Sequence, residues 1–302
     1  MRAGAALLVV GDIVTDVVAR HRAPLARGTD TAARIRILPG GAGANVACWA
    51  ARWGCGDVRM VGRVGADDTA WHAEQLRLAG VRPRLVPDPE VATATVIALV
   101  DTTAERTFLT DSGAVLRLSP ADWSPSLLDG VGHLHLSGYL LFSETSRRTA
   151  LLAMESARAQ AVPVSVDPAS AGFITGLGVD RVLTALGGAD VLFPNADEAR
   201  LLTGLPDPAE AAAVLSRHVP LTVVTLGAEG ALVAESGAVT ARVPPVRAEA
   251  VDSTGAGDAF TGAFLAARLS GADAPEAAAQ GCLAGAEAVT VVGGRPQSEK
   301  AP

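Results

Sequence analysis

The chain has 302 residues, of which 49% are hydrophobic and 19% charged, and its formal net charge is −7. These values exclude a disordered protein and leave ample material for a buried core. The basic residues are scattered along the chain, which argues against a nucleic-acid partner. Apolar runs stay shorter than the roughly 20 residues of a membrane span.

Apolar runs of strand length alternate with amphipathic stretches of helix length. The predicted strands are Ala5–Val10, Val58–Val61, Val131–Leu136, Val162–Val166, Val191–Phe193 and Leu221–Leu226. The predicted helices between them are Ala44–Trp53, Asp68–Ala79, Ser146–Gln160, Asp197–Leu202 and Pro208–Arg217. This alternation predicts an α/β fold, with a doubly wound, mainly parallel sheet and helices on both faces.

Two stretches, roughly residues 16–38 and 92–109, interrupt this alternation with β-branched and polar residues that lack a helical period. In the second, a turn at Asp101–Glu105 separates two strand-like segments, as in a hairpin. We predict that both stretches form a small β sheet that covers the site as a lid. The sequence shows no internal repeat and no linker, so we expect residues 1–302 to form a single domain.

Lys300 is the only lysine in the chain. A Walker A loop and the β3 lysine of a protein kinase both require a lysine inside the domain. If this protein transfers phosphate, it therefore uses backbone amides, arginine and metal. The three cysteines, Cys48, Cys55 and Cys282, lack C-x-x-C spacing and follow no signal peptide, which predicts a cytoplasmic location.

The segment Asp252–Phe260 carries the strongest chemical signal. Gly255, Ala256 and Gly257 stand where a loop enters a long apolar run, so their N–H groups and the start of a helix can together bind phosphate. Asp258 follows directly, and a carboxylate beside a bound anion makes sense mainly as a proton acceptor. A plain glycine-rich loop is the alternative. The pattern favours phosphoryl transfer to a hydroxyl, with Asp258 as general base.

A second glycine-rich segment, Gly40–Ala47, also leads into a predicted helix. Within it, Gly40, Gly41 and Asn45 are candidate substrate-binding residues, because Asn45 can hydrogen-bond a ligand hydroxyl both as donor and as acceptor. A plain tight turn at the glycines is an alternative. A Rossmann dinucleotide loop would follow the first strand closely, whereas these glycines come much later in the chain. A dehydrogenase is therefore the weaker interpretation.

Together, Gly40–Ala47 and Val251–Phe260 resemble the two signatures of the ribokinase/PfkB family of carbohydrate and nucleoside kinases, and the resemblance covers nearly the whole chain. It implies a ribokinase-like fold and transfer of the γ-phosphoryl group of ATP to a small sugar or sugar-like substrate. It also suggests a homodimer formed through the lid. A nucleoside kinase and a non-catalytic sugar- or nucleotide-binding protein remain alternatives, although Phe108 is the only aromatic residue in the two lid stretches.

The resemblance also assigns the nucleotide side of the site. Asn195 and Glu198 resemble the family's N-x-x-E motif, which orders Mg²⁺ and phosphate, although the same pair can form a helix capping box. The other matching positions are Thr225, Gly227 and Gly230 in the nucleotide-binding turn, and Asp252 and Thr254 where many relatives bind a monovalent cation such as K⁺.

On the acceptor side, Asp16 matches the family's sugar-binding aspartate, and Asp12 is either a second sugar ligand or a turn-forming residue. Val14 occupies the position where ribokinase has an asparagine, which favours fructokinase-like or ketogluconate-kinase-like acceptors over ribose. Arg106 is either a ligand for an acidic or hydroxylated substrate or a solvated strand residue.

His133 and His135 alternate along one predicted strand and so share a face, a spacing that also occurs in metal sites. No third ligand is evident in the sequence. We therefore expect both histidines to be packed and hydrogen-bonded rather than metal-bound.

Overall fold

The computed structural model describes residues 5–102 and 106–297. Its larger sheet has nine strands, in the order β13-β12-β11-β10-β9-β8-β1-β4-β5. These are β13 (Ala238–Val243), β12 (Ala231–Glu235), β11 (Leu221–Thr225), β10 (Val191–Leu192), β9 (Val164–Asp167), β8 (Val131–Ser137), β1 (Ala6–Val10), β4 (Val58–Gly65) and β5 (Val81–Asp88). All neighbours from β11 to β5 are parallel, and β12 and β13 add an antiparallel edge.

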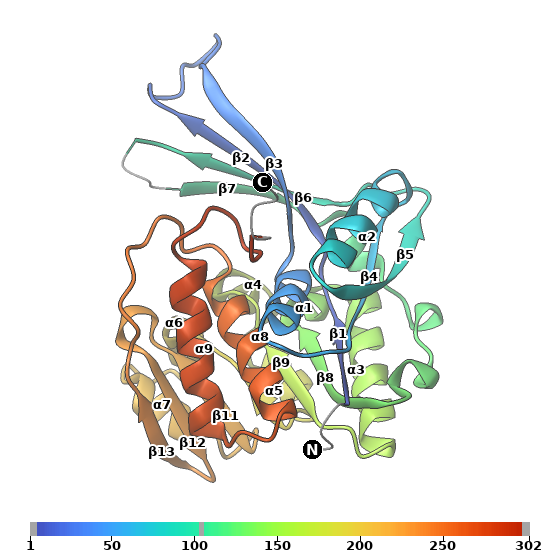
Figure 1. Ribbon diagram of the computed structural model, residues 1–302, viewed down its shortest axis with the longest axis vertical. Coiled ribbons are helices and arrows are strands. Elements are labelled where there is room, and N and C mark those ends of the chain that lie inside the picture. Colours follow the sequence, from blue (N-terminus) through green and yellow to red (C-terminus); the bar gives the residue numbers. More distant parts are fainter. Residues whose placement is uncertain (1–4, 103–105, 298–302) are drawn as a thin grey trace.

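Helices cover both faces of this sheet (Figure 1). They are α1 (Ala42–Arg52), α2 (Thr69–Leu78), α3 (Glu144–Ala159), α4 (Ala171–Leu177), α5 (Val179–Leu186), α6 (Ala196–Thr203), α7 (Pro208–Leu215), α8 (Ala256–Leu269) and α9 (Ala274–Ala288). The fully buried strand β1 separates the two cores, because Leu8 belongs to the core that includes residues of α3 to α7 and Leu7 to the core that includes residues of α1, α8 and α9. The predicted doubly wound α/β fold is confirmed.

The predicted strands and helices all occur, with ends shifted by a few residues. The elements that were not predicted are β5, β12, β13, α4, α5 and α9. Strand β5 lies at the edge of the sheet and contains Arg82, Pro83, Arg84 and Pro87. It therefore lacks the continuous apolar run by which the buried strands were predicted.

The two irregular stretches form one four-stranded sheet, in the order β3-β2-β6-β7, which projects from one end of the molecule (Figure 1). We call it the small sheet. Its strands are β2 (Val14–His21), β3 (Ala33–Gly40), β6 (Ala94–Val100) and β7 (Arg106–Asp111). Its β6–β7 hairpin confirms the predicted one, and β2 joins it in parallel.

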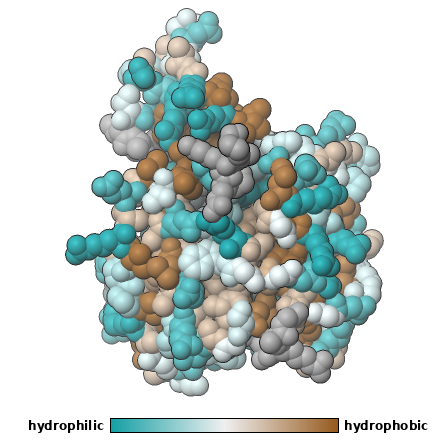
Figure 2. All heavy atoms as spheres, in the orientation of Figure 1, coloured by the Kyte–Doolittle hydropathy of each residue, from teal (hydrophilic) through white to brown (hydrophobic). Residues whose placement is uncertain are grey.

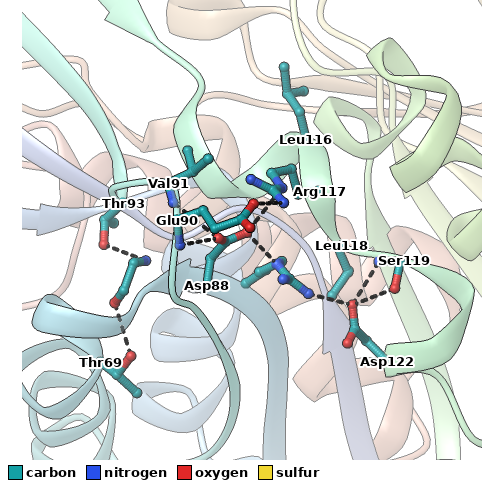
Figure 3. Close-up of polar contacts among 12 residues, drawn as sticks. Thr69, Asp88, Glu90, Val91, Thr93, Leu116, Arg117, Leu118, Ser119 and Asp122 are labelled. Atoms are coloured by element: carbon teal, nitrogen blue, oxygen red, sulfur yellow. Dashed lines mark hydrogen bonds and ion pairs between the residues drawn. The ribbon is translucent and has the colours of Figure 1, made fainter.

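A network of charged groups holds the base of this hairpin against the large sheet (Figure 3). The buried carboxylate of Asp88, at the end of β5, accepts hydrogen bonds from the N–H groups of Glu90 and Val91 and from Nε of Arg63, at 2.8 Å for the latter. Arg117, which follows β7, pairs with Asp88 at 3.2 Å, and Arg63 also reaches Asp122 at 3.0 Å. The network therefore joins the chain before β6 to the chain after β7.

Within the described ranges, the model contains no helix with the length and hydrophobicity required to traverse a bilayer.

Candidate active site

A cavity of about 550 Å³ lies between the carboxyl ends of the central strands and the small sheet. The large sheet contributes residues at or just after the ends of β1, β8, β9, β10 and β11, as expected for the ligand site of a parallel sheet. Among the predicted site residues, the cavity is lined by Asp12, Asp16, Gly41, Asn45, Asn195, Glu198, Thr225, Thr254, Gly257 and Asp258. The structure thus brings most of the predicted site together.

Helix α8 begins in the predicted glycine-rich segment. Gly255 is its N-cap and has a left-handed backbone (φ 74°), and a side chain there would collide with Gly294, so only glycine fits. Asp258 lies in the first turn of α8, where it faces the cavity. Gly257 lines the cavity, whereas Gly255 and Ala256, which precede it, do not.

Asp258 is paired with the other glycine-rich segment. Its Oδ2 accepts a hydrogen bond from Nδ2 of Asn45 at 2.8 Å. Burial raises the pKa of Asp258 well above its ordinary value, the nearby carboxylates of Asp167 and Asp12 raise it further, and the Asn45 hydrogen bond opposes the rise. A raised proton affinity suits a carboxylate that accepts a proton from an alcohol.

Asp12 anchors the start of α1. Its carboxylate accepts hydrogen bonds from the N–H groups of Ala42 at 2.7 Å and Gly43 at 3.0 Å, and from Oγ of Ser137 at 2.6 Å. The N-cap Gly41 has φ 95°, and a Cβ there would lie 2.5 Å from the carbonyl oxygen of Asp12. Asp12 is therefore a structural anchor that also lines the cavity.

Asp16 lies on β2 and faces the cavity beside Gly40, and any Cβ at Gly40 would collide with the Asp16 carboxylate. Burial raises the pKa of Asp16 to about 6; Arg295 opposes the rise, while Asp12 and Asp252 add to it. Arg295 was not predicted. It is buried and donates from Nη2 to the carbonyl oxygen of Gly40 at 2.9 Å. No sequence signal links two residues so far apart in the chain.

Asn195 and Glu198 form the capping box of α6. Oδ1 of Asn195 accepts from the Glu198 N–H, and Oε2 of Glu198 accepts from the Asn195 N–H, each at 2.9 Å. Burial raises the pKa of Glu198 to about 7 and, with the charge of Glu198, raises that of Asp167 well above its ordinary value. A buried and a partly exposed carboxylate that repel each other in one cavity fit a hard divalent cation.

In the described part of the chain, no cluster of three or more His, Cys, Asp or Glu side chains is arranged to hold a metal.

Asp252 and Thr254 lie in the loop before α8. Oδ1 of Asp252 accepts from the N–H and the hydroxyl of Thr254, and its Oδ2 accepts from the N–H of Gly293 at 3.0 Å. The bond to Gly293 ties the loop to the C-terminal segment. The monovalent-cation site stays a prediction.

Gly227 and Gly230 are not among the described residues that line the cavity. Gly227 begins a short 3-10 helix and Gly230 has φ 92°, and together they shape the turn after Thr225, which does line the cavity. Arg106 begins β7 opposite Val100, but its side chain lies outside the described part of the structure.

Sequence reasoning missed most of the aromatic residues of the cavity, because it looked for them only in the lid. Tyr139, Phe173 and Phe193 line the cavity together with Phe108. The rings of Tyr139 and Phe173 meet edge to face with centroids 5.4 Å apart. Tyr139 follows β8 and Phe173 lies in α4, an element that was not predicted.

The histidine pair lies in the buried sheet. Nε2 of His133 and Nδ1 of His135 both hydrogen-bond Oγ of Ser165, at 2.8 and 2.9 Å. Burial lowers the pKa of each histidine to about 3, so both are neutral near pH 7. This arrangement agrees with the packed, hydrogen-bonded state expected from the sequence.

Comparison with known proteins matches residues 5–301 to the pfkB family carbohydrate kinase. This chain belongs to the pfkB family. It is 33% identical over 272 residues to a fructokinase from Klebsiella pneumoniae, covering 85% of this chain and 82% of that protein. It is 29% identical over 261 residues to a ribokinase from Lactococcus lactis subsp. lactis, covering 85% and 81%.

Solved structures of kinases have a similar fold. The adenosine kinase from Sinorhizobium meliloti superposes with a TM-score of 0.88 at 24% identity, covering 98% of this chain and 97% of that one, which supports the fold. A putative ribokinase II from E. coli in complex with ATP and Mg²⁺ superposes with a TM-score of 0.85 at 26% identity, covering 96% and 94%. The pfkB protein is thus a kinase, a phosphotransferase with an alcohol group as acceptor, and the dehydrogenase and binding-protein alternatives no longer apply.

Proposed function

We propose that this pfkB kinase transfers the γ-phosphoryl group of ATP to a hydroxyl of a small sugar or sugar-like substrate, with Asp258 as general base. One observation carries the proposal: Asp258, at the N-terminus of α8, faces the same cavity as Asp12 and Asp16 and is hydrogen-bonded to Asn45. A base, an anion-binding helix start and acceptors for sugar hydroxyls thereby meet in one place.

In the proposed reaction, Asp258 takes the proton of the acceptor hydroxyl as that oxygen bonds to the γ-phosphorus. The bond between the γ-phosphorus and the bridging oxygen breaks, and ADP leaves with the electron pair. The N–H groups at Gly255, Ala256 and Gly257 stabilise the charge on the transferring group, which suits a chain whose only lysine is Lys300.

Asn195, Glu198 and Asp167 would hold Mg²⁺, directly or through water, and the cation would neutralise phosphate charge when bound. The mutual repulsion of Glu198 and Asp167 supports this placement. The ATP and Mg²⁺ of the E. coli structure support the same pair of ligands here. The turn formed by Thr225, Gly227 and Gly230 would approach the nucleotide, and Asp252 and Thr254 would bind K⁺.

For the acceptor, Asp16, Asp12 and Asn45 would accept or donate hydrogen bonds to sugar hydroxyls, with Gly40 and Gly41 allowing close approach. Arg106 is proposed as an outer ligand. A nucleoside is the second candidate, because the rings of Tyr139, Phe173 and Phe108 give the cavity an apolar side on which a flat base can pack.

We also infer that the kinase acts in the cytoplasm and pairs through its small sheet. Register places Ile37, Val17, Ile97 and Leu109 in one row across all four strands, on the face opposite Asp16. Ile37 is 63% exposed and Leu109 55% exposed. A second copy of the same apolar face would cover this row in a two-fold dimer.

The proposed function is tested by coupled measurement of ADP release with ATP and Mg²⁺ across sugars, keto-deoxy acids and nucleosides. We expect turnover of at least one acceptor. Asp258→Asn should lower kcat by about 100-fold or more, because the neutral amide cannot accept the proton. Asp180→Asn is the control, since Asp180 is exposed in the first turn of α5 and is not among the described residues that line the cavity. Failure of the whole panel, or an unaffected Asp258→Asn, would refute the proposal.

A further inference from the structure

Arg295 is buried although much of its hydrogen-bonding capacity is unused. Its exposed fraction is 8%, and among the described residues Nε and Nη1 have no hydrogen-bond partner. Only Nη2 is paired, with the carbonyl oxygen of Gly40. Burial of an incompletely paired guanidinium is costly, so stability alone does not account for its place.

The segment that carries Arg295 touches predicted site residues at three consecutive positions. The N–H of Gly293 donates to Asp252, the backbone of Gly294 lies against the side chain of Asn45, and Arg295 binds Gly40. The indole N–H of Trp49 donates to the carbonyl oxygen of Gly294 at 2.9 Å, which fixes the segment to α1. The segment therefore braces α1 and the end of β3 at the same time.

Gly40 connects Arg295 to the acceptor aspartate. It pairs with Val14 at the start of β2, and its Cα lies against the carboxylate of Asp16. The guanidinium attracts the Asp16 carboxylate and opposes the effect of burial on its pKa. The charged or titratable groups near this pair are Asp12, Cys48, His72 and Asp252.

We propose that Arg295 is a positioning residue for the acceptor: it fixes the turn at Gly40, against which the Asp16 carboxylate lies, and places its positive charge near that carboxylate, without contacting the acceptor itself. Arg295 is not among the described residues that line the cavity, whereas Asp16 is. The proposal rests on the proposed function, in which Asp16 binds acceptor hydroxyls. An ionised Asp16 offers only hydrogen-bond acceptors, as paired hydroxyls require.

The test measures the kinetics of Arg295→Met and Arg295→Lys with an acceptor that the wild type phosphorylates. Arg295→Met should raise the acceptor KM about 10-fold or more, while kcat at saturating acceptor and the KM for ATP change less than about 3-fold. Arg295→Lys restores the charge and should recover much of the lost affinity. In the control Arg52→Met, the arginine removed joins α1 to α9 through Glu287 at 3.2 Å but lies at the surface.

A second measurement needs no acceptor. Carbon-13 NMR of labelled aspartates, with the Asp16 signal identified by Asp16→Asn, should show the Asp16 carboxyl titrating at higher pH in Arg295→Met. If that variant does not fold, Arg295→Gln keeps a donor toward Gly40 and removes the charge, and should show the same titration shift.

The proposal is overturned if the acceptor KM is unchanged, if both KM values rise equally, or if the Asp16 titration does not move. If the wild type phosphorylates no acceptor, the proposed function fails, while the titration still decides whether Arg295 holds Asp16 as a carboxylate. Adding Asp16→Asn to Arg295→Met should weaken acceptor affinity no further than Asp16→Asn alone, because Arg295 acts through Asp16.

Discussion

Asn45 and Asp258 are 213 residues apart in the chain, yet their side chains share a hydrogen bond of 2.8 Å. Each was predicted separately, as a polar residue in the first turn of a helix that follows glycines. Local sequence can predict such a turn because glycine and a following apolar run act within a few residues. The hydrogen bond between them depends on how α1 and α8 pack, which no local pattern encodes.

At the residue scale, the low pKa values of His133 and His135 predict that the fold loses stability in acid. Their pKa, about 3 in the fold, lies below the ordinary 6.5, so the unfolded chain binds more protons between these values. Their contribution to stability is complete above pH 6.5 and is lost as the pH falls toward 3. Each histidine can contribute up to about 1.4 kcal/mol per pH unit to the change of the unfolding free energy with pH.

Urea unfolding between pH 7.5 and 5 measures this slope. The variant His135→Gln cannot take up the proton and should show a shallower decline of the unfolding free energy than the wild type. Replacement of the exposed His218 with Gln is the control. Identical slopes for wild type and His135→Gln would contradict the prediction.

At the scale of elements, we predict that the charged network around Asp88 anchors the small sheet to the large sheet (Figure 3). Arg63→Met removes two ion pairs and leaves the buried Asp88 with less positive charge around it. We expect a loss of about 2–3 kcal/mol of unfolding free energy. The loss should be accompanied by a raised acceptor KM, since β2 and β6 both line the cavity.

Chemical unfolding of Arg63→Met measures the loss of stability, and steady-state kinetics of the same variant measure the acceptor KM. In the control Arg82→Met, the arginine side chain is 69% exposed and its contact with Asp57 is 3.5 Å long, so we expect less than about 1 kcal/mol. An Arg63→Met variant no less stable than the control would show that the network does not anchor the hairpin.

At the scale of the whole molecule, the apolar row on the face of the small sheet opposite Asp16 predicts a dimer. Figure 2 shows hydrophobic residues among polar ones on the part of the molecule that projects at the top. Ile37→Asp places a charge in the centre of the apolar row and should convert a dimer into monomers of 30.5 kDa. Analytical ultracentrifugation at micromolar concentration measures this directly.

Leu78→Asp is the matched control, because Leu78 is 68% exposed at the end of α2, away from that row. A wild type that sediments as a monomer, or a dimer unaffected by Ile37→Asp, would exclude pairing through this face.

The sequence by itself determined the alternation of buried strands and helices, the two glycine-led helix starts and the absence of an internal lysine, and these sufficed for the fold class and the family. Each depends on residues close together in the chain, where backbone preference and apolar periodicity act directly. Only the tertiary structure decided that Arg295 binds the carbonyl oxygen of Gly40, that the charges of Asp167 and Glu198 interact, and that Tyr139 and Phe173 line the cavity. These relations arise when parallel strands bring their carboxyl ends to one edge, and packing, rather than sequence distance, sets which side chains then meet.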